Sequence, residues 1–298
     1  MTSAAPDIKG PLVEEWLDLH FFRPTGFVVA RWARSLRLTA DHVTMLCLAI
    51  GLVGGNLLVY RSVPLNWLGV VLLVTSDIFD SADGQLARMT GTSTKLGRVL
   101  DGFSDSLRFT NVYASLAVHA VLVGAGWSAI ALAGAALLVH TVQASAADFI
   151  RQAYLLYGAG RASDLDLPST LPSPAGPAWR RFAQARYNDW VRMQARLFPR
   201  TAALARELGP GTTPPTAFRA RYEALQSPWV RRCWWFAQNI RFVLIAAGVA
   251  SGEPTTFFWL TLLLPTPLCF WIVRGHERNA ALLLDEVACS RHPEARVA

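Results

Sequence analysis

The sequence predicts an all-α, polytopic membrane protein with six transmembrane helices, an N-terminal interfacial amphipathic helix and a cytoplasmic helical insert. Three observations lead to this prediction. The hydrophobic fraction is 52%. Several stretches of about 20 residues carry almost no charge, and apolar runs of about 18 residues or more are typical of membrane-spanning helices. The positive charge between these stretches is almost entirely arginine.

Residues 8–36 precede the first apolar run and mix apolar side chains with Glu, Asp and Arg. This pattern is typical of a helix, or a pair of helices, lying in the plane of the membrane interface. Pro24 is expected to break or kink the stretch. A soluble core helix is the alternative. The first residues lack the pattern of a cleaved signal peptide, so the first span is expected to direct targeting.

Six spans follow, and tight-turn signals at Pro64, at Gly124–Gly126 and at Gly252 with Pro254 separate consecutive pairs. The predicted spans are residues 41–60, 65–89, 96–124, 127–156, 229–250 and 254–274. The domains that follow from them are the N-terminus and interfacial helix (1–37), transmembrane helices 1–4 (38–157), the insert (158–228), transmembrane helices 5–6 (229–276) and a C-terminal tail (277–298).

The polar insert sets the predicted orientation. Residues 151–232 contain thirteen Arg against five Asp and Glu, whereas the turns at 61–64, 124–127 and 251–254 hold one Arg and one Glu. By the positive-inside rule the insert, both termini and the 90–95 loop are cytoplasmic. We expect the membrane to be a bacterial inner membrane. Within the insert, two helical stretches are expected, residues 177–208 and 215–226.

Composition also excludes some classes of protein. A net charge of +7 suits contact with anionic lipid headgroups or with a phosphorylated substrate. A nucleic-acid binder would not need the apolar runs, so we expect no nucleic-acid partner. The four cysteines show no CxxC spacing, which supports neither a zinc site nor a disulfide framework.

The ends of the second and third spans carry aspartates at helical spacing. Asp80 and Asp83 are three residues apart, and Asp101 and Asp105 are four apart, so each pair shares one helical face. A hairpin of the two helices would bring four carboxylates together, where a low dielectric magnifies their repulsion. They would stay ionised only with cations between them, and hard divalent cations such as Mg²⁺ prefer carboxylate oxygens. Soft ligands suited to zinc or copper are lacking nearby.

A pair of metal ions held by carboxylates is suited to phosphoryl transfer, because it neutralises pyrophosphate oxygens and orients in-line attack. Gly84 and Gly97 lie on the same faces as the aspartates, where a missing side chain lets a nucleotide approach the backbone. Arg88 lies one turn from Gly84 and is placed to bind phosphate through its fork of donors.

The full pattern, D-x2-D-G-x2-A-R-x8-G-x3-D-x3-D, resembles the signature of the CDP-alcohol phosphotransferase (CDP-alcohol phosphatidyltransferase) family at all eight fixed positions. The resemblance covers the six spans and the interfacial helix, and it leaves most of the insert unexplained. It implies that Asp80, Asp83 and Asp101 are metal ligands. Asp105 would contact a metal and act as general base on the acceptor hydroxyl. It further implies two Mg²⁺ or Mn²⁺ ions and a homodimer.

The resemblance also implies a site for the CDP moiety. Its residues would be Asp80, Asp83, Gly84, Ala87, Arg88 and Gly97. The family has a threonine at the start of the first span, usually after Pro-Asn and an apolar residue. Thr44 fits this position, although Pro-Asn is replaced by Asp41-His42. Phosphatidylinositol-phosphate synthases often carry Arg directly after the last aspartate. Ser106 stands there, which argues against an inositol phosphate acceptor.

Further polar residues in the spans are candidates for the acceptor side, because such groups tend to face a bundle interior or a wet cavity. They are Asp148, Gln238, Asn239 and Arg241. Ordinary interhelical hydrogen bonding is the alternative. Asp77, one turn deeper than the motif, is expected either to bond a neighbouring helix or to support the metal site. Trp229, Trp234 and Trp235 are interpreted as an interfacial belt.

The expected activity is transfer of a phosphatidyl group from CDP-diacylglycerol to an acceptor hydroxyl with release of CMP, in phospholipid biosynthesis. One alternative is an aminoalcohol or polyol phosphotransferase with a soluble CDP-alcohol donor and a lipid acceptor. Another is a prenyl-diphosphate enzyme, whose motif has adjacent aspartates and lacks D-G-x2-A-R. The non-enzyme alternative is a divalent-metal transporter, whose site usually lies near the bilayer midplane.

Overall fold

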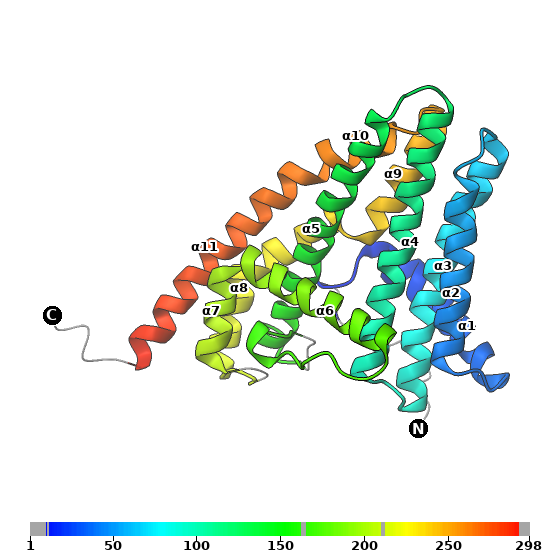
Figure 1. Ribbon diagram of the computed structural model, residues 1–298. Coiled ribbons are helices and arrows are strands. Elements are labelled where there is room, and N and C mark those ends of the chain that lie inside the picture. The colour runs from blue at the N-terminus through cyan, green and yellow to red at the C-terminus, as the bar shows by residue number, and fades with distance from the viewer. Residues whose placement is uncertain (1–9, 11, 162–164, 210–211, 292–298) are drawn as a thin grey trace. The chain divides into compact units, whose positions relative to one another are not determined.

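The structure is a computed structural model that describes residues 10, 12–161, 165–209 and 212–291. Every regular element within these ranges is a helix, which confirms the predicted all-α class (Figure 1). The chain divides into two compact units. Unit 1 consists of Met1–His140 with Gln238–Leu264, and unit 2 consists of Thr141–Ala237 with Pro265–Ala298.

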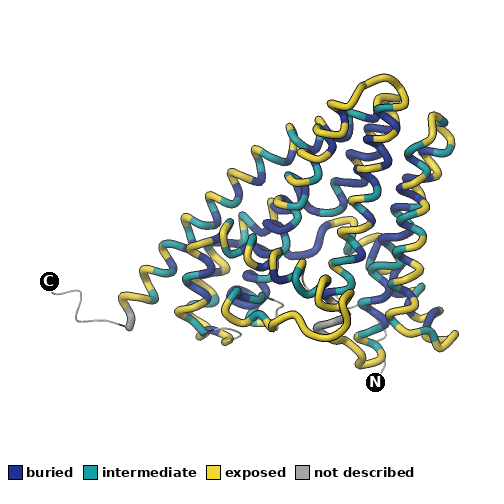
Figure 2. The backbone as a smooth tube through the Cα atoms, in the orientation of Figure 1, coloured by how far each residue is buried: buried dark blue, intermediate teal, exposed yellow. Residues whose placement is uncertain are grey.

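Within the described residues, unit 1 contains eight helical elements, one π-helical turn and seven α-helical segments. They are η1 (Asp18–Phe22), α1 (Arg23–Ser35), α2 (Ala40–Leu57), α3 (Val63–Thr90), α4 (Lys95–Leu122), the first part of α5 (Ser128–Tyr157), α9 (Gln238–Ser251) and α10 (Thr256–Leu263). Unit 2 holds the rest of α5, η2 (Pro168–Thr170), α6 (Ala178–Leu197), α7 (Pro199–Leu208), α8 (Thr216–Arg232), η3 (Cys233–Phe236) and α11 (Pro265–Arg291). Figure 2 shows buried and exposed residues alternating along the helices, as expected for helices packed along one face.

One face of the N-terminal helix α1 is buried against the rest of unit 1. α1 buries Phe27, Ala30 and Ala33 and packs against α3, while Val28 and Trp32 are exposed. The chain stays helical through the predicted break. The π-turn η1 ends two residues before Pro24, where the missing N–H and the ring disturb the regular hydrogen-bond ladder. The location of this helix at a membrane surface stays a prediction.

Helix α2 packs against both α3 and α4, and glycines allow the close approach. A Cβ on Gly54 would lie 2.9 Å from the carbonyl oxygen of Gly69 in α3, so no side chain fits there. A Cβ on Gly55 would collide with the amide of Asn111 in α4, which donates to the carbonyl of Leu52 over 2.9 Å. α2 therefore fixes the positions of the two helices that carry the aspartates.

The turn between α3 and α4 is built by local capping. Gly91 ends α3 in the left-handed region (φ 68°), which is the usual role of glycine after a helix. Thr94 caps α4, and its hydroxyl accepts a hydrogen bond of 2.9 Å from the backbone N–H of Gly97. The short turn places the acidic end of α3 and the acidic start of α4 on either side of it.

An aromatic core joins α4, α9 and α10 in unit 1. Tyr113 stacks on Phe258 with ring centroids 5.9 Å apart and donates to Thr261 over 3.5 Å. Burial of such a side chain stabilises by roughly 1.5–3 kcal/mol. His119 bonds the carbonyl of Leu58 at 2.8 Å and is buried, as expected for a structural histidine.

Among the described residues, five helical segments are long and apolar enough to cross a membrane. They are Ala40–Leu57, Val63–Thr90, Ser128–Tyr157, Thr216–Ser251 and Thr256–Cys289. The predicted third span, 96–124, coincides with α4 but is not among them, because charged residues interrupt its first half. The count of six spans is therefore not confirmed. The predicted fifth span is broken at η3, and the sixth is divided where Pro265 starts α11.

Unit 2 contains the insert and matches the predicted helices closely. α6 and α7 together cover 178–208, and Pro199 separates them because proline cannot continue the hydrogen-bond ladder of α6. The core of the unit includes Phe149 stacked on Phe198 at 4.6 Å and Tyr157 against Tyr222 at 5.7 Å. The cytoplasmic location of the insert stays a prediction.

Candidate active site

Two of the predicted aspartates share one arginine in unit 1. Arg108, in α4, donates from Nη2 to Asp80 Oδ1 over 3.0 Å and from the same nitrogen to Asp105 Oδ1. Its side chain is 4% exposed, whereas those of Asp80 and Asp105 are 23% and 29% exposed. The arginine therefore neutralises the carboxylates from the buried side, and the carboxylates reach solvent on the other.

Helix α2 and a serine of α3 surround the side chain of Arg108 and hold it in place. Arg108 Nη1 donates to Ser76 Oγ over 2.7 Å, and Ser76 in turn donates to the carbonyl of Cys47 over 2.8 Å. A Cβ on Gly51 would lie 2.6 Å from Arg108 Cδ and 2.7 Å from Ser76 Oγ. Gly51 thus leaves room for the side chain to pass between the helices.

Thr44 and Asp83 also meet in the structure. The Thr44 hydroxyl lies 2.6 Å from Asp83 Oδ2 and 3.1 Å from the carbonyl of Ala40, one turn earlier in α2. Asp83 is buried and Thr44 is half-buried. The threonine predicted from its place in the first span therefore contacts the motif directly, although the Pro-Asn that usually precedes it is absent.

The remaining aspartates lie around the same cluster. The carboxylates of Asp101 and Asp105 are close enough to interact electrostatically with Asp80. Asp77 interacts electrostatically with Arg108, and it accepts a hydrogen bond from Gln238 at the start of α9. Of the two interpretations of Asp77, the bond to a neighbouring helix is the one observed.

The predicted nucleotide-site residues lie at the turn between α3 and α4. A Cβ on Gly84 would lie 3.3 Å from Arg88 Nη1, so the exposed Arg88 folds back over the bare glycine. Ala87 is half-buried one position before Arg88. Gly97 lies in the first turn of α4 beside Thr94. These residues place a guanidinium beside the aspartates, over a glycine that has no side chain.

The predicted acceptor residues fall in both units. In unit 1, Gln238 bonds Asp77, Asn239 donates to Asp18 Oδ1 over 3.1 Å, and Arg241 is fully buried. In unit 2, Asp148 accepts from Gln194 Nε2 over 2.9 Å. Each contact observed for Gln238, Asn239 and Asp148 is an ordinary polar bond, so an acceptor role for these four residues stays a prediction.

The donor set fits a hard divalent cation in its chemistry, because it consists of carboxylates with two partly exposed members. Across the described ranges, however, no group of three or more His, Cys, Asp or Glu is arranged tightly enough to hold a metal ion. Arg108 supplies the positive charge instead, and one guanidinium faces Asp77, Asp80 and Asp105. The cluster therefore keeps an excess of negative charge that an added cation would offset.

Sequence reasoning missed the role of Arg108 and Gly51. The sequence alone assigned Arg108 no role. Its i,i+3 spacing from Asp105 was the available signal, because that spacing places both side chains on one helical face. No local sequence pattern indicated the role of Gly51, because its contacts are with residues of two other helices.

The comparisons with known proteins agree with the motif. Residues 37–160 match the family model for CDP-alcohol phosphatidyltransferase. The inner membrane protein YnbA of Escherichia coli (strain K12) is 32% identical over 92 residues, which are 30% of this chain and 44% of that protein. The chain thus matches less than half the length of this relative. No solved structure matches the chain significantly. The five apolar helices and this relative together indicate a multi-pass membrane protein.

Proposed function

We propose, from the premise that residues 37–160 form a CDP-alcohol phosphatidyltransferase domain, that the chain transfers a phospho-alcohol group from a CDP-alcohol to an acceptor hydroxyl. The observation that carries the proposal is the pairing of Asp80 and Asp105 on one buried arginine. This pairing assembles aspartates from both halves of the motif at one place.

In the proposed reaction the acceptor oxygen forms a bond to the β-phosphorus of the donor as the bond between that phosphorus and CMP breaks. Asp105 takes the proton of the acceptor hydroxyl, and CMP leaves with the electron pair. Its exposed carboxylate edge suits contact with a substrate. A phosphodiester is formed at the cost of a pyrophosphate bond, and positioning and electrostatics are the main requirements.

Asp80, Asp83, Asp101 and Asp105 are proposed to hold the divalent cations, Mg²⁺ or Mn²⁺, whose chemistry is to neutralise the pyrophosphate. Asp80 and Asp83 also lie against the cytidine diphosphate. Thr44 orients Asp83 through its short hydrogen bond. Arg108 balances the carboxylates from behind and keeps Asp105 aimed at the exposed side.

The CDP moiety is proposed to bind over the turn between α3 and α4. Gly84 and Gly97 have no side chain, and Ala87 adds only a methyl group. Arg88 supplies a fork of donors for phosphate oxygens. In this arrangement the nucleotide remains in water at the end of the helices.

The donor is proposed to be lipidic, with CDP-diacylglycerol as the leading choice, because a site at the membrane interface lets acyl chains remain in lipid. The acceptor would be a small alcohol, bound on the side of Gln238, Asn239 and Arg241 in unit 1. Six spans, a cytoplasmic active site, cytoplasmic termini and a homodimer belong to the same proposal. An aminoalcohol or polyol transferase with a soluble donor is the rival within this reaction class.

The test is release of CMP by the purified full chain with CDP-diacylglycerol and a panel of polyols and amino acids, with the product mass measured. Asp105→Asn is expected to abolish release, and Asp285→Asn, which changes an exposed carboxylate on α11, should leave it unchanged. Failure to release CMP from every CDP-alcohol tried would refute the proposal. Mn²⁺ uptake into vesicles without CMP release would instead favour a divalent-metal transporter.

A further inference from the structure

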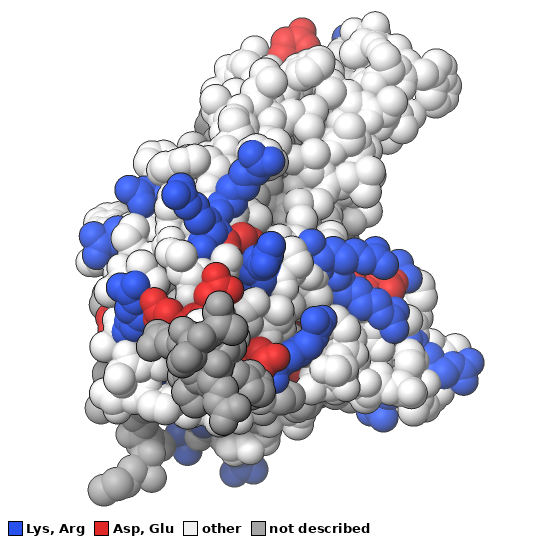
Figure 3. Space-filling model, turned by 90° about the vertical axis from the view of Figure 1, so that its left-hand side faces the viewer, with Lys and Arg blue, Asp and Glu red and all other residues white. Residues whose placement is uncertain are grey.

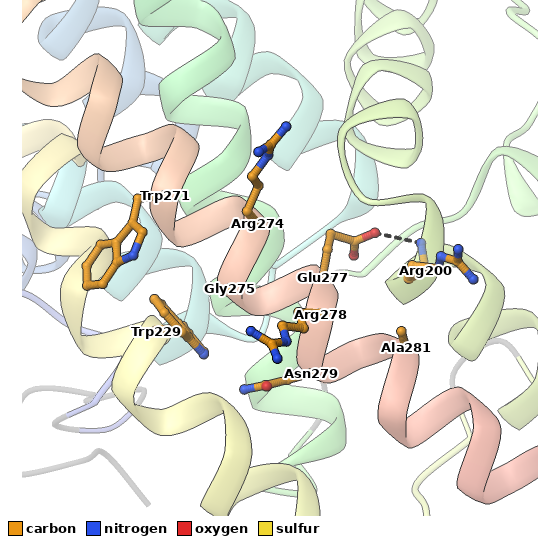
Figure 4. A pocket seen from close by; sticks show the side chains of 9 residues that line it. All are labelled: Arg200, Trp229, Trp271, Arg274, Gly275, Glu277, Arg278, Asn279 and Ala281. Carbon is orange, nitrogen blue, oxygen red and sulfur yellow. Dashed lines mark hydrogen bonds between the residues drawn. The ribbon is translucent and has the colours of Figure 1, made fainter.

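A groove of about 730 Å³ lies in unit 2 between α7, α8 and α11 (Figure 4). Arginine and tryptophan side chains from all three helices line it, namely Arg200, Trp229, Trp271, Arg274 and Arg278. A smaller hollow of about 380 Å³ lies along α8 and adds Arg231 and Arg232. None of these residues takes part in the candidate active site.

The carboxylate that lines the groove, Glu277, is already engaged. Its oxygens accept hydrogen bonds from the backbone N–H of Arg200 at 2.7 Å, from that of Thr201 at 3.0 Å and from the Thr201 hydroxyl at 2.6 Å. These donors belong to the first turn of α7, where backbone N–H groups lack helical partners. Glu277 thus caps α7, and its bonds go to backbone and hydroxyl groups rather than to guanidinium groups.

The arginines of the groove are without carboxylate partners. Among the described residues, no ion pair includes Arg200, Arg274 or Arg278. Arg274 lies over the ring of Phe270 at 4.3 Å instead. Figure 3 looks onto the left-hand side of the view in Figure 1 and shows basic side chains with some acidic ones among them. Positive groups gathered in this way repel one another, and a bound anion would relieve the repulsion.

An aromatic wall, formed by Trp229 and Trp271, lies beside the arginines of the groove. Trp229 and Trp271 meet edge to face with centroids 5.1 Å apart, and the Trp229 ring packs directly on Gly275, where any side chain would collide. Arg232 lies over both rings, 5.5 Å from Trp229 and 5.3 Å from Trp271. Figure 4 shows the Arg278 side chain pointing toward Trp229. The groove therefore offers an anion site next to an apolar surface.

Both helices that form this wall belong to segments suited to span a membrane, Thr216–Ser251 and Thr256–Cys289. Trp229 opens the predicted fifth span and Arg274 closes the predicted sixth, so both are expected at a membrane interface. Tryptophan is enriched at that depth, and basic pockets between helices bind anionic lipid headgroups. A soluble anion would use the arginines but not the tryptophans.

We propose that this groove binds an anionic phospholipid. Its phosphate contacts Arg278, which points toward Trp229, and Arg274 adds positive charge from one helical turn earlier on α11. Its acyl chains lie along Trp229 and Trp271. Arginine suits this role because its planar fork binds two phosphate oxygens at once. This lipid is bound in unit 2 and is not the substrate of the aspartate cluster.

The test counts lipids that remain on the delipidated, purified full chain by native mass spectrometry. The probes are phosphatidylglycerol and phosphatidylcholine with identical acyl chains. We expect the wild type to retain phosphatidylglycerol about tenfold better. Arg274→Ala with Arg278→Ala should abolish this preference. The matched control, Arg186→Ala with Arg192→Ala, removes two exposed arginines of α6 that pair with Asp189, and should keep the preference.

Three results would overturn the proposal: no preference in the wild type, equal loss in the control variant, or full displacement of the lipid by excess inorganic phosphate. Gly275→Leu provides a second check, because it retains every arginine but displaces the Trp229 ring. It should weaken retention of both lipids, and unchanged retention would contradict the acyl-chain placement. No CDP-alcohol is present, so the outcome does not depend on CMP release.

Discussion

Arg108 and Asp80 form an ion pair of 3.0 Å that joins α4 to α3 beneath the acidic cluster. The same guanidinium nitrogen also binds Asp105, which lies three residues earlier in α4. A buried positive charge thus stands where the carboxylates of two helices meet. Both the stability of this region and its response to metal ions should depend on Arg108.

Removal of this buried charge should destabilise the protein most when metal is absent. We expect Arg108→Gln to lower the free energy of unfolding by about 2 kcal/mol in EDTA, less than for fully buried ion pairs because both carboxylates are partly exposed. Mg²⁺ should restore much of the loss by neutralising the same carboxylates. Thermal melting with EDTA and with Mg²⁺ measures both effects. Exposed Arg61→Gln is the control, and an equal shift in that variant would contradict the prediction.

The glycine that makes room for Arg108 allows the same contact to be disturbed without changing charge. Gly51→Ala should displace the arginine stem and reduce CMP release, because the added methyl group would lie 2.6 Å from Arg108 Cδ. Gly134→Ala is the matched control, since no atom lies within 4 Å of a Cβ there. The control should stabilise the helix by up to about 1 kcal/mol. Equal activity in both variants would show that the Arg108 side chain can shift without loss of activity, which would contradict the prediction.

The short hydrogen bond between Thr44 and Asp83 should contribute to donor binding. Thr44→Val keeps the shape of the side chain but removes the hydroxyl, and hydrogen bonds to charged groups contribute about 1.5–3 kcal/mol. We expect kcat/KM for the CDP-alcohol to fall about tenfold or more, whereas Thr44→Ser should retain most activity. Measuring kcat/KM for the CDP-alcohol in both variants tests this prediction. Equal losses would point to the methyl group instead.

The hydrogen bond between Gln238 and Asp77 allows a structural role of Gln238 to be distinguished from a role in binding the acceptor. Gln238→Leu should destabilise unit 1 by about 1–3 kcal/mol, because it leaves a buried carboxylate without this donor. In a double-mutant cycle with Asp77→Asn the two losses should not add. Denaturant unfolding provides these values, and the KM for the acceptor is measured on the same variants. A large rise in that KM with unchanged stability would place Gln238 in the acceptor cavity.

Local sequence patterns predicted most of unit 1. The apolar runs gave the helices of residues 40–157 to within a few residues, because hydrophobic length and turn signals are local properties. The break at η3 was missed, since the apolar run continues across Cys233–Phe236 without a proline or glycine. The division of the chain into two units was also missed, because it arises from contacts between distant segments.

The sequence by itself determined the all-α class, the carboxylates of the motif and the shared faces of Asp80 with Asp83 and of Asp101 with Asp105. These follow from residue type and from the helical period, which needs no knowledge of neighbouring helices. Tertiary structure alone decided which partners these groups meet. Arg108 reaches Asp80 because α2 packs against both α3 and α4 and presents Gly51 at the crossing. Close approach of helices depends on complementary surfaces, and complementarity is a property of pairs of segments rather than of either one.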